Sequence, residues 1–235
     1  MNNTACNIQE NVLTIIGLEK TYRDSLSGES LTILKNLDMQ VPEKTKVVIL
    51  GESGCGKSTL LNIIGGLDAA SGGYIQCGKY TISGMDEDQL TEFRSRYLGL
   101  IFQFHYLLKD FSALENVFLP AYMAGVPKKQ AMERAKTLLN DVGLSHRFNH
   151  IPSQLSGGER QRAAVARSLV NDPHLILADE PTGNLDPANS GVISSLLFSM
   201  VEKYGKTLLL VTHDHELAQY SDAAYKLADG KLERV

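Results

Sequence analysis

A glycine-rich stretch at residues 51–58 has the composition and spacing of a phosphate-binding loop. Its residues are Gly51, Glu52, Ser53, Gly54, Cys55, Gly56, Lys57 and Ser58, and Thr59 follows them. The glycines let successive backbone N–H groups converge on phosphate oxygens, Lys57 can reach the terminal phosphates, and Ser58 can offer its hydroxyl to Mg²⁺. Apolar residues on both sides predict a strand before the loop and a helix after it, whose positive end would face the anion. We therefore interpret the loop as a nucleotide-binding segment rather than a chance glycine-rich turn.

Two acids, Asp179 and Glu180, directly follow the apolar run at residues 175–178. In open α/β sheets, ligands lie at the carboxyl ends of strands, where one acid can hold Mg²⁺ and a second can polarise an attacking water. Two solvated loop acids are the commoner meaning of such a pair, but the phosphate-binding loop in the same chain favours the catalytic interpretation. The two motifs together predict nucleotide hydrolysis.

A third segment, Ser156, Gly157, Gly158 and Glu159, opens a predicted helix that runs through Leu169. Ser156 and Glu159 have the spacing of a capping box, which satisfies free N–H groups at a helix start. A capping box needs no glycine, and each glycine costs about 1 kcal/mol of helix propensity. Close approach of the backbone to an anion explains the glycine pair. We predict a capped helix end that also binds phosphate.

The elements that must position these residues follow from the hydrophobic pattern. The first part of the chain has β-type runs around a polar turn at residues 24–30, which predicts an antiparallel start. The unbroken apolar run at 47–50 is typical of a parallel strand that is buried on both faces. Residues 85–171 are mostly helical in pattern, most clearly at 127–142. The expected strands are 12–18, 31–41, 46–50, 98–102, 175–178 and 207–211, with a helix over 187–203 and a hairpin over 224–232.

These elements predict one domain of the α/β class with a P-loop NTPase core and a mixed sheet. Residues of about 1–84 and 172–235 form the expected catalytic core, which carries an antiparallel β-subdomain near the N-terminus. Residues of about 85–171 form the expected inserted helical subdomain.

The phosphate-binding loop, the LSGGE segment at 155–159 and the strand that ends in two acids, in that order, resemble the ATP-binding subunits of ABC transporters. The resemblance covers nearly the whole chain, about residues 13–232. It implies the ABC ATPase fold, ATP and Mg²⁺ as ligands, and ATP hydrolysis. It also implies a head-to-tail homodimer, in which Ser156, Gly157, Gly158 and Glu159 contact the ATP held by the loop of the second subunit.

The resemblance assigns further residues by their place in the family's motifs. Gln103 matches the glutamine loop that senses Mg²⁺ and the γ-phosphate, so the implied Mg²⁺ ligands are Ser58, Gln103 and Asp179. Asp186 matches the loop that crosses the dimer interface, and we expect it also to cap the helix that begins at residue 187.

The last two assignments are the switch histidine and the adenine contact. His213 matches the histidine that contacts the γ-phosphate, and Tyr22 matches the aromatic residue that stacks on adenine. Without the resemblance, a solvated histidine and an exposed strand tyrosine would be the ordinary interpretations. No catalytic motif is degenerate, so the implied catalytic residues are Glu180, His213, Gln103 and Lys57.

Residues 102–117 and 149–155 resemble the ATPases of lipoprotein-releasing systems, which lie on the cytoplasmic face of Gram-negative inner membranes. The tetrapeptide at 183–186 also occurs in MacB-type exporters of peptides or small molecules and in FtsE-like non-transporting regulators. Both therefore stay open as alternatives, as does a soluble ATPase. The implied partners are LolC/LolE-like or MacB/FtsX-like permeases. We expect the apolar run at 104–111 to supply part of a groove for that partner, although core burial would explain some of its side chains.

Composition limits the remaining classes. The chain has 235 residues and a formal net charge of −4, so its charge argues against nucleic acid as a partner. Its three cysteines, Cys6, Cys55 and Cys77, fit neither a disulfide framework nor a zinc site and suit a reducing compartment. No apolar run approaches the ~18 residues that span a bilayer, so we expect membrane attachment through a partner.

Overall fold

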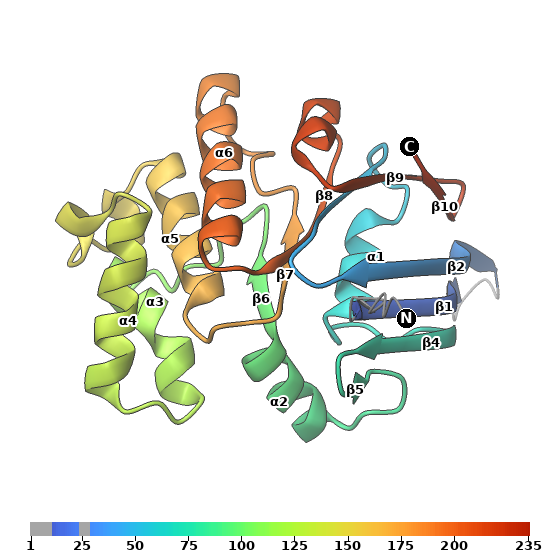
Figure 1. Ribbon diagram of the computed structural model, residues 1–235, viewed down its shortest axis with the longest axis horizontal. Helices are drawn as coiled ribbons and strands as arrows, with labels where there is room; N and C mark the ends of the chain where they lie inside the picture. The colour runs from blue at the N-terminus through green and yellow to red at the C-terminus, as the bar shows by residue number, and fades with distance from the viewer. Residues whose placement is uncertain (1–10, 24–28) are drawn as a thin grey trace, which may run out of the picture.

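The computed structural model describes residues 11–23 and 29–235, and it describes the side chains of these residues except at 187 and 188. Cys6 and most of the predicted turn at 24–30 lie outside the described residues. The described strands form two sheets, and helices cover the larger sheet (Figure 1).

The larger sheet has the strand order β10-β9-β3-β8-β7-β6 and is parallel except for the final hairpin of β9 and β10. Its strands are β3 (Lys46–Leu50), β6 (Leu98–Ile101), β7 (Leu175–Asp179), β8 (Thr207–Thr212), β9 (Ala223–Ala228) and β10 (Lys231–Arg234). The smaller sheet is antiparallel, in the order β2-β1-β4-β5. Its strands are β1 (Asn11–Arg23), β2 (Ser30–Pro42), β4 (Gly72–Cys77) and β5 (Tyr80–Thr81). The predicted α/β class and antiparallel start are therefore confirmed.

Strand β3 shows why the parallel sheet is apolar throughout. Val47 and Ile49 belong to a core that includes the smaller sheet and α1. Val48 and Leu50 belong to a second core, formed with α3, α4, α5 and α6. Because successive side chains on a strand point to opposite faces, a strand covered on both sides needs an unbroken apolar run.

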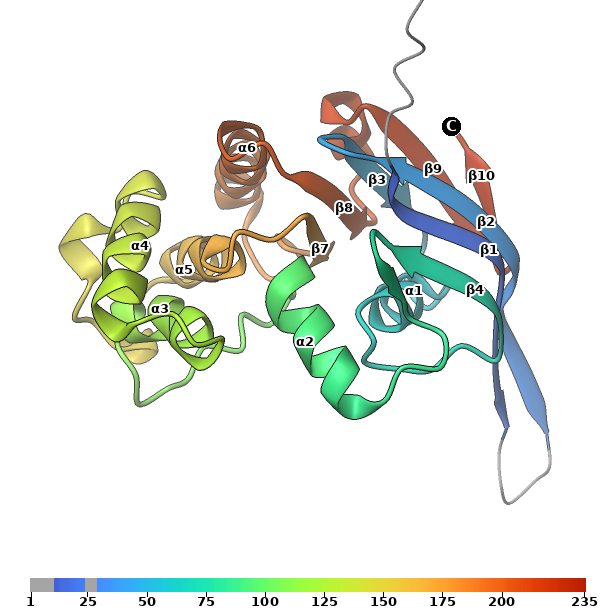
Figure 2. The same cartoon turned by 60° about the horizontal axis from the view of Figure 1, so that its bottom comes forward.

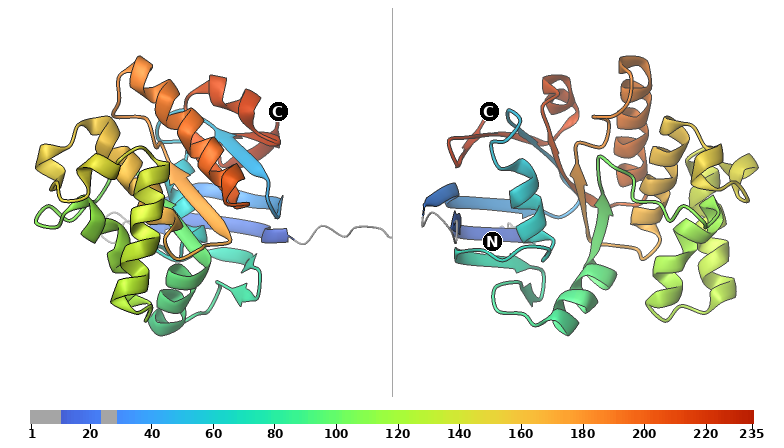
Figure 3. Two further views of the ribbon diagram at one scale, coloured as in Figure 1. Left: turned by 60° about the vertical axis from the view of Figure 1, so that its left-hand side comes forward. Right: turned by 180° about the vertical axis from the view of Figure 1, so that it is seen from behind.

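The helices are α1 (Lys57–Ile64), α2 (Glu87–Tyr97), α3 (Ala113–Met123), α4 (Lys128–Asp141), α5 (Gly157–Leu169) and α6 (Pro187–Lys203). Short 3₁₀ turns lie at η1 (Ser145–Arg147), η2 (Pro152–Gln154) and η3 (His215–Tyr220). Helix α1 lies between the two sheets (Figure 2). Helices α3, α4 and α5 lie at the opposite end of the molecule from β1 and β2 (Figure 3).

The helical region at residues 85–171 divides between the two cores. Phe93 and Tyr97 of α2 are buried with the smaller sheet and α1, and β6 belongs to the parallel sheet. Helices α3, α4 and α5 instead bury apolar side chains against one another and against α6. The helix predicted over 127–142 is confirmed as α4, and it ends before Gly143, whose φ of +74° suits a helix C-terminal stop.

Candidate active site

A cavity of about 610 Å³ lies at the carboxyl ends of β3, β7 and β8. These strands are parallel neighbours, so the segments that follow them meet at one edge of the sheet. The cavity gathers most of the residues that the sequence predicted. Its lining is Tyr22, Ile33, Glu52, Ser53, Gly54, Gly56, Lys57, Ser58, Thr59, Gln103, Glu180 and His213.

The loop between β3 and α1 has the backbone that a bound anion requires. Gly54 and Gly56 have φ values of +80° and +106°, which glycine adopts without steric cost. A Cβ on Gly56 would lie 2.7 Å from the Ile33 side chain, so space also demands glycine there. No described side chain caps the start of α1. Its first N–H groups are therefore available to phosphate oxygens.

Lys57 is the first residue of α1 and is buried, with only 6% of its surface exposed. Its ammonium donates to the carbonyl oxygens of Gly51 at 2.8 Å and Glu52 at 2.9 Å. It also lies 3.4 Å from Oε1 of Glu180. A buried ammonium needs such partners, and here they hold the cation at the cavity wall.

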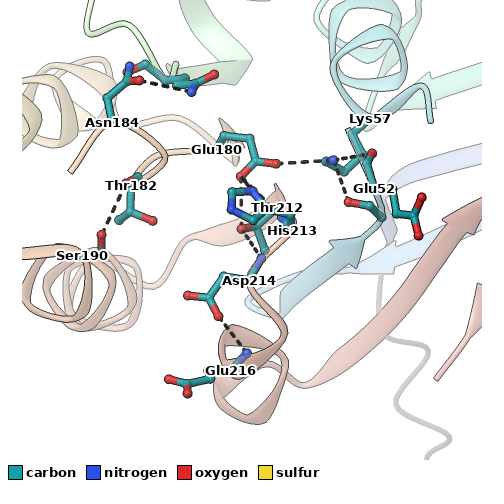
Figure 4. A network of polar contacts seen from close by, with 12 residues as sticks. Glu52, Lys57, Glu180, Thr182, Asn184, Ser190, Thr212, His213, Asp214 and Glu216 are labelled. Atoms are coloured by element: carbon teal, nitrogen blue, oxygen red, sulfur yellow. Dashed lines mark hydrogen bonds and ion pairs between the residues drawn. The ribbon is translucent and has the colours of Figure 1, made fainter. Parts of the chain in front are cut away.

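Glu180 lies between Lys57 and His213 (Figure 4). Its Oε2 is 2.9 Å from Nδ1 of His213, and its backbone N–H donates to the Val211 carbonyl at 3.0 Å. Glu180 has a φ of +43°, a left-handed conformation that costs a non-glycine residue about 1–3 kcal/mol. The sheet edge thus holds Glu180 in an unfavourable backbone conformation. The two oxygens of its carboxylate face two different cavity residues, Lys57 and His213.

Asp179 has the features of a metal ligand. Its Oδ1 is buried and has no hydrogen-bond partner among the described residues. Burial raises the pKa of Asp179, while a hydrogen bond with Ser58 opposes that rise. Carboxylate, hydroxyl and amide oxygens are hard donors of the kind that Mg²⁺ prefers. Asp179, Ser58 and Gln103 therefore fit Mg²⁺ as predicted ligands.

Gln103 is held by Asn184, a residue to which the sequence analysis gave no role of its own. The Gln103 side-chain amide donates to Oδ1 of Asn184 at 3.3 Å, and the Asn184 side-chain amide donates to the backbone carbonyl of Gln103 at 3.0 Å. The loop after β6 is thereby tied to the loop before α6. No local sequence pattern around Asn184 signals this contact.

The predicted capping box at the start of α5 is present. Ser156 Oγ accepts from the Glu159 N–H at 3.2 Å, and Glu159 Oε2 accepts from the Ser156 N–H at 2.8 Å. Arg147, which the sequence analysis missed, donates to the other Glu159 oxygen at 2.8 Å. Ser156, Gly157, Gly158 and Glu159 do not line the cavity that the chain's own phosphate-binding loop lines.

The remaining predicted residue, Asp186, is the N-cap of α6, and its carboxylate accepts from the Asn189 N–H at 3.2 Å. The expected capping role is therefore confirmed. The interface role implied by the resemblance stays a prediction.

Replacing Glu159 by Gln should lower the free energy of unfolding by about 1–3 kcal/mol at pH 7, because a buried, charge-assisted network is broken. Hydrogen bonding to Ser156 and Arg147 lowers the pKa of Glu159 from 4.5 to about 2 against the opposing effect of burial. A lowered pKa stabilises the fold above pH 4.5, and this stabilisation is lost as the pH falls toward 2. The difference between the two proteins should therefore shrink by about 1 kcal/mol between pH 7 and pH 4.

Urea denaturation at both pH values measures this effect. Glu133→Gln is the matched control, because it removes an exposed carboxylate that pairs with Lys136 and should change stability by less than about 1 kcal/mol. A Glu159→Gln deficit that stayed constant with pH would contradict the assigned pKa.

Comparisons with known proteins define the class of this site. Residues 34–183 match the family described as ABC transporter. The chain belongs to the ABC transporter family.

Within that family, the chain is similar to proteins named "Lipoprotein-releasing system ATP-binding protein LolD". The protein from Treponema denticola is 58% identical and aligns over 97% of this chain and all of its own length. The protein from Treponema pallidum is 50% identical over 95% of this chain and 98% of its own length. The protein from Legionella pneumophila strain Paris is 44% identical over 94% and 96%, respectively.

Solved structures agree with the family. The chain is similar to the "ATP-binding cassette MJ0796 bound to ADP and Pi", described as a dimeric post-hydrolysis state, with a TM-score of 0.85 and 38% identity. This similarity covers 94% of this chain and 97% of that one. The structure of cbiO1 from Clostridium perfringens has a TM-score of 0.83 and 27% identity over 95% and 87% of the two chains. The predicted ABC ATPase fold is confirmed.

Proposed function

We propose that the chain is the ATP-hydrolysing subunit of a transporter that releases lipoproteins from the inner membrane through permease subunits. One observation carries the proposal: relatives with this named function align over nearly the whole chain at up to 58% identity. The cavity supports it, because the phosphate-binding loop, Gln103, Glu180 and His213 surround one space.

The proposed chemistry is hydrolysis of the terminal phosphate of ATP. The loop N–H groups and Lys57 bind the phosphates, and Glu180 accepts a proton from the attacking water. His213 contacts the γ-phosphate and is oriented by its contact with Glu180. Gln103 lines the same cavity, which supports its proposed role in sensing that phosphate. Mg²⁺, when bound, neutralises charge on the phosphates, and Ser58, Gln103 and Asp179 are its proposed ligands.

The proposed active unit is a homodimer with composite sites. Ser156, Gly157, Gly158 and Glu159 lie apart from the chain's own cavity, which supports contact with nucleotide on a second subunit. Asp186, at the N-cap of α6, is also a proposed residue of the dimer interface. The dimeric form of the similar cassette supports this arrangement.

Two further assignments are proposals of the same kind. Tyr22 supplies the surface on which adenine stacks, and residues of about 85–171 act as the helical subdomain of the cassette. The proposed location is the cytoplasmic face of the inner membrane, where the chain is peripheral. Within residues 11–23 and 29–235, no helix has both the length and the hydropathy that crossing a bilayer requires.

An apolar groove of about 570 Å³ offers a surface for the membrane partner. It lies between α2, β6, α3 and α5, and its apolar lining includes Phe102, Tyr106, Leu119 and Met123. Tyr106 is 66% exposed and Met123 is 77% exposed. Exposed apolar side chains around a groove favour docking of an amphipathic helix.

The groove differs from the segment that the sequence predicted. Of that segment, only Tyr106 lines it, and α2, β6, α3 and α5 supply most of the rest. Leu107 packs against the helical core, so core burial explains this residue. Phe104, Leu108 and Phe111 are exposed outside the groove.

Arg167 fixes the edge of the groove. Its guanidinium donates to the carbonyl oxygens of Tyr106 and His105, both at 2.7 Å. Tyr106 has a φ of +46°, so its backbone needs such support. Arg167 lies near the C-terminal end of α5, and residues 156–159 lie at its N-terminal end. Helix α5 therefore joins the groove to the segment that is proposed to contact the nucleotide of the second subunit.

Tyr106→Asp and Met123→Asp should each reduce recovery of the chain with its membrane partner by at least about tenfold, because a charge would enter an apolar interface. Phe104→Asp is the matched control, since Phe104 is 61% exposed but does not line the groove. Pull-down from detergent-solubilised membranes measures association, and a thermal melt checks folding. Equal recovery of all three folded variants would place docking elsewhere.

The experiment that tests the function itself is mass spectrometry of the complex purified from membranes. We expect an acylated lipoprotein together with a permease. Recovery of a permease with bound peptides or small molecules would instead indicate a MacB-type exporter. Recovery of an FtsX-like partner without cargo would instead indicate an FtsE-like regulator.

A further inference from the structure

The Tyr22 ring at the mouth of the nucleotide cavity is held by two residues outside the predicted motifs. The Tyr22 hydroxyl donates to Oδ2 of Asp68 at 2.6 Å. Asp68, in the turn after α1, accepts from the Lys20 ammonium through its other oxygen, also at 2.6 Å. Lys20 donates in addition to the carbonyl of Ala69 at 2.7 Å. These contacts tie the end of β1 to the turn after α1.

Lys20 also occupies one side of the aromatic ring. Its ammonium is 4.5 Å from the centroid of the Tyr22 ring, within the range of a cation–π contact. Lys20 is buried, with 7% exposure, and does not line the cavity, whereas Tyr22 is 44% exposed and does. The ammonium therefore covers the protein side of the ring, and the opposite side remains for a ligand.

The contacts fix the ring relative to the phosphate-binding loop. Hydrogen bonding to Asp68 raises the pKa of Tyr22, and a hydrogen bond with Thr59 opposes that rise. Burial alone would raise the pKa of Asp68, but the hydrogen bonds from Lys20 and Tyr22 outweigh it and lower this pKa. The hydroxyl thus lies between the residue that follows the loop and an ionised carboxylate. A ring anchored at its hydroxyl loses little freedom when a base stacks on it.

We propose that Asp68, supported by Lys20, is a positioning residue that holds Tyr22 as a preformed stacking surface for the purine base of the nucleotide. The inference rests on the proposed function, because it takes Tyr22 as the residue that contacts the base. Asp68 itself touches no nucleotide and acts through the ring.

The test compares two ligands that share the phosphates but differ in the base. Calorimetric titration of the purified full-length chain in Mg²⁺ gives the dissociation constants for ATP and for inorganic triphosphate. Tyr22→Ala should weaken ATP binding by about 10–100-fold and leave the dissociation constant for triphosphate near the wild-type value. Tyr22→Phe and Asp68→Ala should each weaken ATP by about threefold to tenfold with the same selectivity, because the ring remains but its anchor is lost.

Three further variants distinguish a positioning role from a merely structural one. Asp68→Asn keeps an oxygen that accepts from Tyr22 and should restore ATP binding to within about twofold of wild type. Tyr74→Phe is the matched control, because Tyr74 is an exposed strand tyrosine whose hydroxyl donates to the neighbouring Gln76 side chain. Combining Tyr22→Phe with Asp68→Ala should weaken ATP binding no more than either change alone, since both changes remove the same hydrogen bond between Tyr22 and Asp68.

The outcomes separate the inference from its premise. If Tyr22→Ala weakened the binding of ATP and of triphosphate equally, Tyr22 would not contact the base, and the proposed role of Tyr22 would fail. If Tyr22→Ala were selective but Tyr22→Phe and Asp68→Ala bound ATP like wild type, the positioning role of Asp68 would be overturned and the stacking role would stand. Additive losses in the double variant would also overturn it.

Discussion

Replacing Glu180 by Gln should lower steady-state ATP turnover by about 10²–10⁴-fold, the range that a general base contributes, while ATP binding stays near wild type. Gln has the same shape and can still contact Lys57 and His213, which lie 3.4 and 2.9 Å from the carboxylate. It has no basic oxygen to accept a proton from water. Phosphate release measures turnover, and filter binding measures retained ATP.

Glu216→Gln is the matched control for this experiment. Glu216 is an exposed acid on η3, close to the site but outside the cavity lining, so turnover should be unchanged. Wild-type turnover by Glu180→Gln would show that another group accepts the proton.

The Glu180→Gln chain should accumulate as a dimer with ATP, because it binds the nucleotide but hydrolyses it slowly. Adding Gly158→Asp to this chain should abolish the ATP-dependent dimerisation without weakening ATP binding by the single subunit. Gly158 does not line the chain's own cavity, and a Cβ there meets no heavy atom closer than 3.8 Å, so the change is tolerated within the subunit. In the proposed dimer, the new carboxylate would face the phosphates bound to the second subunit. Such like-charge contact should raise the concentration needed for dimerisation by at least about 100-fold.

Light scattering during gel filtration, with and without ATP, measures this shift. Gln130→Asp introduces the same residue at an exposed position of α4 and should dimerise normally. A Glu180→Gln, Gly158→Asp chain that still dimerised with ATP would place the α5 N-terminus away from the second nucleotide.

Activity of mixed subunits gives an independent measurement. Lys57→Ala and Gly158→Asp chains should each be inactive alone. In a mixed dimer, the intact loop of one chain meets the intact α5 N-terminus of the other. Each mixed dimer therefore has one intact composite site. If one such site suffices, mixing equal amounts should restore at least about a quarter of wild-type turnover, which is the value for random pairing of the subunits.

The motifs with local chemistry could be predicted from the sequence. The capping box joins residues three positions apart, and the phosphate-binding loop acts through consecutive N–H groups, so a short stretch specifies each structure. The apolar runs of β3, β7 and β8 and the amphipathic α4 were found for the same reason. Tyr22, Gln103 and His213 carried no such signal and were identified by resemblance alone.

The residues that the prediction missed act over long sequence distances. Asn184 contacts Gln103 from 81 positions away, and Arg167 contacts Tyr106 from 61. Asp68 contacts Tyr22 from 46 positions away. No local pattern encodes such pairs, because they depend on which strands become neighbours and in which register.

The sequence by itself determined the chemistry of this protein: a phosphate-binding loop, two acids at a strand end and a glycine-rich helix start, each specified by neighbouring residues. Only the tertiary structure decided how these parts are held. The strand order β3-β8-β7 brings Lys57, His213 and Glu180 to one sheet edge, and the placement of α2, α3 and α5 around β6 creates the groove. Burial of both faces of the parallel sheet requires such an assembly of distant segments, since no single segment can cover its own apolar residues.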